Sequence, residues 1–302
     1  MSGMAQHGLI SLRGMGRAHL EGLLDRAQSH VGSPVSNDFA GATVTTAFFE
    51  ASTRTRLSFE RAAHRLGAHV MDLSPDLSST VKGESFKDTI LTLTAIGTDL
   101  FVIRHWLADA AELAAEWSRR PVINAGVGRR EHPTQTLIDA LTLRQEFGHL
   151  DGLRMAIVGD IRNSRVARGH LEVFPTLGME LTLVGPTPFL PSDNPWGVRV
   201  STDLDDELGD VDVVYLLRIQ TERGASDGIP ADGGHARRYG MNVERMSMLK
   251  PAAVIMHPGP INRGVEIDDV AADGDRSLIL EQVANGVPVR MAVISEALGG
   301  SG

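Results

Sequence analysis

The sequence contains no cysteine, and this absence restricts the chemistry that is open to the protein. Disulfide bonds, metal sites built from thiolates and a cysteine nucleophile are all excluded. The chain also has no run of eighteen apolar residues, and residues 1–16 lack the basic segment followed by a long apolar segment that is typical of a secretory signal. We therefore expect neither a membrane span nor a signal peptide, and we expect the protein to be cytoplasmic.

Positive charge is also in short supply. The chain has 29 lysine and arginine residues against 38 aspartate and glutamate residues, which gives a formal net charge of −9 at pH 7. This balance argues against nucleic acid or an anionic membrane as a partner. An acidic protein that binds anions must concentrate its arginines locally, so the positions of the arginines are more informative than their number.

What the sequence does contain is an alternation of short apolar segments with amphipathic ones. A chain of 302 residues, 42% of them hydrophobic, is long enough for two α/β domains, each with its own core. The segment 148–152 (GHLDG) is typical of a boundary, which predicts domains over 1–148 and 149–302. The strand–helix alternation predicts a parallel β-sheet flanked by helices in each domain.

The individual elements are predicted from apolar runs and from helical spacing. Strands are expected at 43–49, 69–73, 100–103, 121–124, 154–158, 180–184, 212–217 and 252–256. Helices are expected from about residue 20 to 31, after 52–55, and at about 85–96, 108–118, 133–148, 164–177, 203–208 and 289–299. The polar segments 74–84 and 221–240 are expected to be mobile loops.

Residues 43–66 combine a buried strand with the start of a helix. The β-favouring run 43–49 predicts the strand, and the apolar spacing up to Leu66 predicts an amphipathic helix. Between them, residues 52–55 (STRT) place hydroxyl groups and an arginine where unpaired backbone N–H groups attract anions. The pattern favours a phosphate site, but an ordinary capped helix with a solvated arginine would have the same four residues.

Polar clusters follow the predicted strands in five places. Because ligands bind at the carboxyl ends of parallel strands, these clusters predict a two-domain enzyme with an anion-binding cleft. The pattern by itself does not identify the reaction. The five clusters lie at residues 52–55, 104, 132–135, 163–165 and 218–220.

Five longer segments carry a resemblance to a known family. They are FFEASTRTRLSFE at 48–60, HPTQTLIDALT at 132–142, VGDIRNSRVARG at 158–169, LLRIQTERG at 216–224 and HPGPINRGVEI at 257–267. Together they resemble the aspartate carbamoyltransferases, in the form of the catalytic chain found in many bacteria, over roughly residues 8–299. STRTR and HPTQ are shared across the carbamoyltransferase superfamily, whereas the last two segments resemble the aspartate branch rather than the ornithine branch.

The resemblance implies a reaction, a fold and a set of partners. The reaction is transfer of the carbamoyl group of carbamoyl phosphate to the amine of L-aspartate, an early step of de novo pyrimidine biosynthesis that needs no metal or cofactor. Residues 1–148 would bind carbamoyl phosphate and 149–302 aspartate, with the last helix, about 286–299, packing back on the first domain. The family forms homotrimers with shared active sites, which leaves open a larger assembly with a dihydroorotase-like or regulatory chain.

For carbamoyl phosphate, the resemblance assigns the phosphate group to STRT, the carbonyl oxygen to Thr55, Arg104 and His132, and the amide end to Gln135. Attack by an amine creates a tetrahedral oxyanion, and one preorganised donor typically lowers such a barrier by about 2.7–4 kcal/mol. His132 is therefore interpreted as a donor rather than as a nucleophile or metal ligand. The implied binding residues are Ser52, Thr53, Arg54, Thr55, Arg104, His132 and Gln135, and the implied catalytic residues are Arg54, Thr55, Arg104 and His132 with Lys82.

For aspartate, two carboxylates must be held at once, which suits the fork of arginine. The resemblance assigns this role to Arg165, Arg218 and Gln220. It also implies that the backbone at Gly259 and Pro260 meets the substrate amine, and this X–Pro bond is the candidate cis peptide.

In the family, a polar loop reaches into the active site of a neighbouring subunit and supplies a serine and a lysine. The loop 74–84 matches it, with Lys82 as the lysine and Ser78, next to Ser79, as the serine. Ser78 and Lys82 are thus implied to contact carbamoyl phosphate in the neighbouring site, and Lys82 also aspartate. Without the resemblance, the loop would be read as a solvated connection.

The chain departs from the family pattern beside His132 and after Arg165. The family commonly has Gly-Asp-Gly and a glutamine where this chain has Val127 between glycines and Glu131. This chain also has Gly169-His170 where the family more commonly has serine and asparagine. These departures leave open a paralogue that uses another acceptor amine. A non-catalytic subunit is a further alternative, and a nucleotide-binding dehydrogenase ranks low because G-x-G-x-x-G is absent.

Overall fold

The computed structural model describes residues 8–73, 83–219 and 234–299. Within these ranges the chain forms two units. The first contains the described residues up to Leu141 and those from Val283 onward, and the second is Thr142–Gln282. Among the described residues, every helix is too short or too polar to cross a membrane.

The first unit is built on a four-stranded sheet in which all the strands are parallel. Its strands are β1 Thr43–Phe48, β2 His69–Leu73, β3 Leu100–Arg104 and β4 Val122–Asn124. Its helices are α1 Arg17–His30, α2 Thr53–Arg65, α3 Phe86–Ile96 and α4 Ala110–Ser118, while α5 Pro133–Phe147 and α11 Ile279–Gly299 extend across the division between the units. The strand order is β2-β1-β3-β4, and Phe48 lies in register with Arg104.

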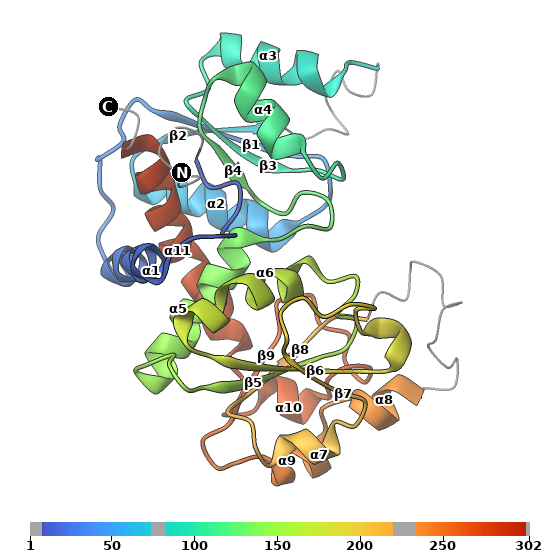
Figure 1. The fold of residues 1–302 in the computed structure, drawn as a ribbon. Helices are drawn as coiled ribbons and strands as arrows, with labels where there is room; N and C mark the ends of the chain where they lie inside the picture. The colour runs from blue at the N-terminus through green and yellow to red at the C-terminus, as the bar shows by residue number, and fades with distance from the viewer. Residues whose placement is uncertain (1–7, 74–82, 220–233, 300–302) are drawn as a thin grey trace. The chain divides into compact units, whose positions relative to one another are not determined.

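Helices cover both faces of this sheet. In Figure 1, α3 and α4 lie on one face, and α1, α2 and α11 lie on the other. Strands β1, β3 and β4 are almost wholly buried, as expected when helices cover both faces, whereas the edge strand β2 is exposed or half-buried along its length. The apolar cluster on the α3–α4 side is formed by Ala47, Ile90, Phe101, Ile103, Ala110, Ala111, Ala114, Ala115, Val122 and Val127.

The last helix packs against the first unit, as the resemblance predicts. Nε2 of His19 lies 2.8 Å from Oε1 of Glu296, and Arg26, also on α1, forms an ion pair with the same carboxylate. The Arg290 guanidinium lies 4.9 Å from the ring centroid of Phe59 on α2. The helix begins at Ile279, earlier than predicted, because Pro288 is accommodated inside it instead of marking its start.

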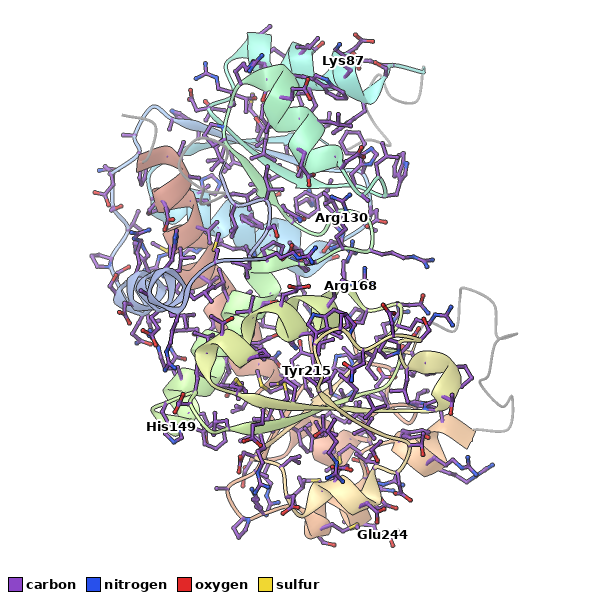
Figure 2. All side chains as sticks on the ribbon, viewed as in Figure 1. Lys87, Arg130, His149, Arg168, Tyr215 and Glu244 are labelled. Carbon is purple, nitrogen blue, oxygen red and sulfur yellow. The ribbon has the colours of Figure 1, made fainter. Side chains whose placement is uncertain are left out.

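The second unit is built on a five-stranded parallel sheet with the order β7-β6-β5-β8-β9. Its strands are β5 Arg154–Val158, β6 Glu180–Val184, β7 Arg199–Ser201, β8 Val213–Leu216 and β9 Val254–Met256. Its helices are α6 Arg165–Val173, η3 Pro175–Leu177, η4 Thr187–Phe189, α7 Asp205–Leu208, α8 Gly234–Tyr239, α9 Val243–Met248 and α10 Asp269–Asp273. Tyr215, labelled in Figure 2, is buried in β8. Its ring packs edge to face against the ring of His170 on α6, with 4.4 Å between the ring centroids.

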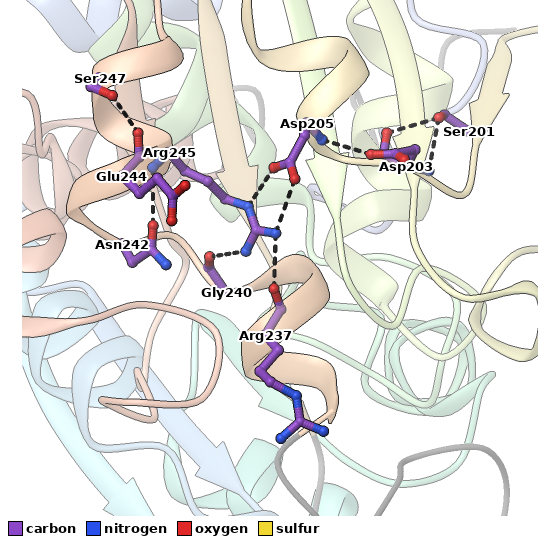
Figure 3. A network of polar contacts seen from close by, with 9 residues as sticks. All are labelled: Ser201, Asp203, Asp205, Arg237, Gly240, Asn242, Glu244, Arg245 and Ser247. Atoms are coloured by element: carbon purple, nitrogen blue, oxygen red, sulfur yellow. Dashed lines mark hydrogen bonds and ion pairs between the residues drawn. The ribbon is translucent and has the colours of Figure 1, made fainter.

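A buried arginine joins three of the short helices in this unit. Figure 3 shows Arg245 of α9 donating through Nε to Asp205 of α7 over 2.6 Å. Its Nη1 donates to the carbonyl of Gly240 over 2.7 Å, and its Nη2 to the carbonyl of Arg237 on α8 over 2.9 Å. Because the Arg245 side chain is only 8% exposed, these acceptors compensate a charge that would otherwise be buried without partners.

The predicted fold class, two parallel sheets flanked by helices, is confirmed, but several short elements differ from the prediction. Residues 234–239 form α8 where the sequence predicts a loop over 221–240; residues 221–233 lie outside the described ranges. Strand β7 has three residues, α9 six and α10 five. Segments of that length contain less than two helical turns or two strand repeats, so apolar periodicity does not reveal them.

Candidate active site

Three of the predicted polar clusters lie at one edge of the first sheet. Strands β1, β3 and β4 are neighbours and run parallel, so their carboxyl ends share an edge. Residues 52–55 follow β1, Arg104 is the last residue of β3, and residues 132–135 follow β4.

Helix α2 begins at Thr53 with Ser52 at its N-cap, within the segment 52–55 where the sequence predicts the start of a helix. Ser52 has an extended backbone (φ −163°, ψ 92°), yet its side chain makes no capping hydrogen bond. The N–H of Arg56 donates to the carbonyl of Ser52 over 3.2 Å, so the N–H groups of the three residues between them have no acceptor one turn earlier in the helix. The hydroxyl of Ser52 and these N–H groups form a set of donors suited to an anion.

The two arginines at the start of α2 have different surroundings. Nη1 of Arg56 lies 2.7 Å from Oδ2 of Asp72 and 3.6 Å from Oε1 of Glu60. Arg54 is exposed, and its guanidinium has no hydrogen-bond or ion-pair partner among the described residues. In an acidic chain, such a guanidinium is suited to bind an anionic ligand.

Arg104 lies between the segments that follow β1 and β4. Its Nε lies 3.7 Å from Oε2 of Glu50, and its Nη1 donates to the carbonyl of Ala125 over 3.3 Å. Its own carbonyl accepts from the N–H of Phe49 over 2.8 Å. The side chain is 14% exposed, so the guanidinium is held in place by both neighbouring segments.

His132 immediately precedes α5, which has Pro133 at its first position. The carbonyl of His132 accepts from the N–H of Gln135 over 2.9 Å, and its side chain is buried. Nε2 of Gln135 donates to Oδ1 of Asp139 over 2.9 Å. Asp139 was not among the predicted site residues, although a glutamine and an aspartate four residues apart on a helix are a recognisable hydrogen-bonding pair.

The two departures from the family pattern beside His132, Val127 and Glu131, both make contacts that support the fold. Val127 is buried in the apolar cluster under α3 and α4, where an aspartate would lack a partner of opposite charge in that cluster. The carboxylate of Glu131 accepts from the N–H of Leu12 over 3.1 Å and from the hydroxyl of Ser11. Glu131 thus holds the N-terminal segment against the start of α5.

In the second unit, the predicted residues again share a sheet edge. Strands β5, β8 and β9 are parallel neighbours; Arg165 begins α6 after β5, Arg218 follows β8, and Gly259 and Pro260 follow β9. Ser164 caps α6 by accepting from the N–H of Ala167 over 3.1 Å. This cap fixes the start of the helix, and Arg165 is therefore its first residue.

The turn after β9 is held by the buried His257, which the sequence places in the motif HPGPINRGVEI without indicating a role for its side chain. The peptide bond Gly259-Pro260 is cis, as expected. Nδ1 of His257 accepts from the N–H of Gly259 over 2.8 Å, so Nε2 carries the ring proton of the neutral imidazole, 3.3 Å from the carboxylate of Glu266. Nδ2 of Asn262 donates to the carbonyl of Ile219 over 3.1 Å, which joins this turn to the segment that contains Arg218.

Three predicted residues, Ser78, Lys82 and Gln220, lie outside the described residues. In the part of the chain that the structure describes, no three histidine, aspartate and glutamate side chains are grouped as metal ligands. The predicted residues therefore form two sets, one at the carboxyl edge of each sheet. The first set offers hydroxyls, backbone N–H groups, two guanidiniums and an imidazole, and the second offers two guanidiniums beside a rigid turn.

Comparison with known proteins gives these sets a family context. Residues 7–145 match the family described as aspartate/ornithine carbamoyltransferase, carbamoyl-P binding domain, and residues 151–296 match its Asp/Orn binding domain. The catalytic subunit of aspartate carbamoyltransferase from Acidothermus cellulolyticus is 52% identical over 261 residues, which cover 86% of this chain and 81% of that one. The corresponding subunit from Rhodospirillum rubrum is 46% identical over 300 residues, covering 97% and 94%.

Solved structures of the same family are similar to this chain. The aspartate transcarbamoylase of Trypanosoma cruzi in complex with carbamoyl phosphate and aspartate is 32% identical and superposes with a TM-score of 0.88 over 97% of both chains. The same enzyme in complex with carbamoyl aspartate and phosphate has a TM-score of 0.88 and 31% identity, over 97% of this chain and 96% of that one. Both family domains are thus present in order and at nearly full length. The chain belongs to the aspartate/ornithine carbamoyltransferase family.

Proposed function

We propose that this protein is an aspartate carbamoyltransferase, which converts carbamoyl phosphate and L-aspartate into N-carbamoyl-L-aspartate and phosphate in de novo pyrimidine biosynthesis. The observation that carries the proposal is the set of STRT, Arg104 and HPTQ at one edge of the first sheet. The names of the relatives support it, and so does the Trypanosoma cruzi structure that is described with both substrates bound.

The first set of residues fits the phosphorylated substrate. Ser52, Thr53, Arg54 and Thr55 would bind the phosphate group through hydroxyls, backbone N–H groups and a guanidinium that has no partner among the described residues. Arg104, His132 and Thr55 would donate to the carbonyl oxygen. As the amine attacks the carbonyl carbon, negative charge develops on this oxygen, and the donors stabilise it.

The second set fits the acceptor. Arg165 and Arg218, with Gln220, would bind the two carboxylates of aspartate through paired N–H donors. The backbone of Gly259 and Pro260 would meet the amine. This turn is fixed by His257, so the carbonyls need little rearrangement when the substrate binds.

The chemistry proceeds by direct transfer. The neutral amine nitrogen forms a bond to the carbamoyl carbon, and the bond from that carbon to the phosphate oxygen breaks, so phosphate leaves with the electron pair and takes up the proton that the amine nitrogen loses. Positioning of the two substrates and stabilisation of the oxyanion account for the acceleration. Residues 1–148 would form the carbamoyl phosphate domain and 149–302 the aspartate domain.

The proposal includes a cytoplasmic homotrimer in which Ser78 and Lys82 complete the active site of a neighbouring subunit. The naming of the relatives as catalytic subunits supports an oligomer, whereas the trimer rests on the resemblance of the loop. A regulatory or dihydroorotase-like chain would extend this oligomer to a larger assembly. Mixing Lys82→Ala chains with Arg54→Ala chains tests it: hybrid assemblies regain activity if sites are shared, and a confirmed mixed oligomer without activity would contradict sharing.

The activity itself is tested by incubating the protein with carbamoyl phosphate and a panel of amino acids, and by measuring the ureido product. We expect product with L-aspartate and little with ornithine or other amines. Product with a different amine alone would identify a paralogue, and no product with any amine would indicate a non-catalytic subunit.

A further inference from the structure

A buried carboxylate lies one helical turn after Gln135. Asp139 is 0% exposed and accepts from Nε2 of Gln135 over 2.9 Å, whereas Gln135 itself is partly exposed. Both residues lie on α5, whose first turn follows His132. Because residues four apart on a helix point the same way, this hydrogen bond is built into the helix and does not depend on a ligand.

The hydrogen bond determines which end of the Gln135 amide faces away from Asp139. A carboxylate has only acceptor atoms, so the group that faces it must be the –NH₂ end of the amide. The carbonyl oxygen Oε1 is then the end that remains for a ligand. An unrestrained glutamine can exchange its two ends by rotating its amide, and would then present either an acceptor or a donor.

We propose that Asp139 is a positioning residue that makes the site selective for an acyl phosphate bearing –NH₂ on its carbonyl carbon. The inference rests on the proposed function, in which Gln135 contacts the amide end of carbamoyl phosphate. The carbamoyl nitrogen has only N–H donors to offer, and a fixed Oε1 accepts one of them. Asp139 is fully buried, so its effect on the substrate would be transmitted through Gln135 and not by direct contact.

The same arrangement rejects the closest analogue without that donor. Acetyl phosphate has a methyl group in place of –NH₂, so Oε1 would lose its partner in the complex. Sites built to hydrogen-bond a substrate N–H or O–H discriminate against analogues that lack it by about 10⁴–10⁵-fold in the strongest cases. One fixed acceptor accounts for part of such a ratio.

The test compares three ligands on the full-length protein. Equilibrium dissociation constants for carbamoyl phosphate, acetyl phosphate and inorganic phosphate are measured for the parent, Asp139→Asn and Asp139→Leu. Both variants release Gln135, since asparagine can bond either end of the amide and leucine neither. We expect affinity for carbamoyl phosphate to fall by about tenfold, the scale of one hydrogen bond, while the other two ligands change by less than about twofold.

Two further variants make the result specific. Thr136→Val is the matched control, because Thr136 is buried on the same helix and its hydroxyl has no hydrogen-bond partner among the described residues; all three constants should stay unchanged. In a Gln135→Leu background, which should itself lose the preference for carbamoyl phosphate, Asp139→Asn should add nothing. Asp139→Asn is nearly isosteric with the parent side chain, so it keeps the test available if Asp139→Leu fails to fold.

The outcomes separate the inference from the proposed function. Equal losses for all three ligands would show that Asp139 only supports the fold, and unchanged binding of carbamoyl phosphate would also overturn the inference. A parent protein that binds carbamoyl phosphate but transfers nothing to aspartate would refute the proposed function, while the comparison of ligands would still decide the role of Asp139.

Discussion

Arg56 and Asp72 form an ion pair between the first turns of α2 and the parallel strand β2, with Nη1 and Oδ2 2.7 Å apart. The carboxylate of Asp72 thus compensates the positive charge of Arg56. Two residues earlier, Arg54 has no such partner among the described residues, although both arginines belong to the same motif. The pairing therefore separates a structural arginine from one that is suited to bind a ligand.

We expect Arg54→Ala to lower kcat/KM for carbamoyl phosphate by about 10²–10³-fold, because a charge-assisted contact to the phosphate is lost in both the bound and the transition state. Steady-state kinetics at saturating aspartate measure this. Arg56→Ala is the matched control on the same helix, and its kcat/KM should stay within about threefold of the parent. Equal losses in the two variants would contradict the distinction.

His132→Ala should lower kcat by about 10²–10³-fold, because the imidazole is proposed to donate to an oxyanion that forms only during the reaction. Equilibrium binding of carbamoyl phosphate should weaken much less. His64→Ala, at an exposed position on α2, serves as the control. If binding fell as far as kcat, the histidine would be a ground-state ligand instead of a stabiliser of the oxyanion.

Arg218→Ala should raise the KM for aspartate by about 10–100-fold, the scale of a hydrogen bond to a charged group. Arg199→Ala is the control in the same unit, since Arg199 is largely exposed and pairs with Glu207 over 2.8 Å. Aspartate saturation curves for both variants provide the measurement. An unchanged KM for aspartate in Arg218→Ala would indicate a different acceptor or a different binding residue.

Glu131→Gln should fold and should keep kcat/KM within about threefold of the parent, because an amide oxygen can still accept one hydrogen bond. Glu131→Ala removes the acceptor of the Leu12 N–H and should lower the free energy of unfolding by about 1–3 kcal/mol. Urea denaturation of both variants, alongside kinetics, measures these effects. Loss of activity in a fully folded Glu131→Gln protein would show that the negative charge itself is required.

We expect the free energy of unfolding to fall in mild acid, because the buried His105 has a lowered pKa. Burial lowers the pKa of His105 from 6.5 to about 4, and the side chain is 2% exposed. The unfolded chain therefore binds a proton near pH 6.5 that the folded chain does not bind until about pH 4, so the stabilisation is complete above pH 6.5 and is lost as the pH falls toward 4. The loss is at most about 3 kcal/mol.

Urea unfolding at pH 7.5 and at pH 5 measures this dependence in the parent and in His105→Asn. The variant has no titrating group at this position, so its stability should fall less between the two pH values. Some slope should remain, because burial also lowers the pKa of His235 to about 4. An identical slope in the two proteins would contradict the assignment.

The sheets could be predicted from the sequence because most of their strands are buried and therefore apolar, although the edge strands β2 and β7 are partly exposed. β5 and β6 are predicted at 154–158 and 180–184 and have those limits, since each largely apolar segment (RMAIV and ELTLV) starts at a charged residue and is followed by a glycine. The limits of α11 were missed because Pro288, ordinarily a helix breaker, lies inside it. Short elements such as β7 carry too few residues to show a period.

The candidate site was predictable only where its residues belong to local motifs. Arg54, Arg104 and His132 follow strands, so their position at a sheet edge can be deduced from the order of elements. The role of Glu131 could not be predicted from the order of elements, because its hydrogen-bond partner Ser11 is 120 positions away in the chain. Asp139 escaped notice because it acts through Gln135, and a motif reveals the side chain that touches a ligand more readily than the one that orients it.

The first unit takes its final helix from the far end of the chain, and this has a consequence for biosynthesis. While the ribosome is still translating the second unit, α1 and α2 lack the helix that supplies Glu296 to His19 and Arg290 to Phe59. The second unit is contiguous, so all of its residues have been synthesised before that helix is complete. The part made first is thus completed last, and a nascent chain stopped before Val283 would leave the surface beneath α11 uncovered.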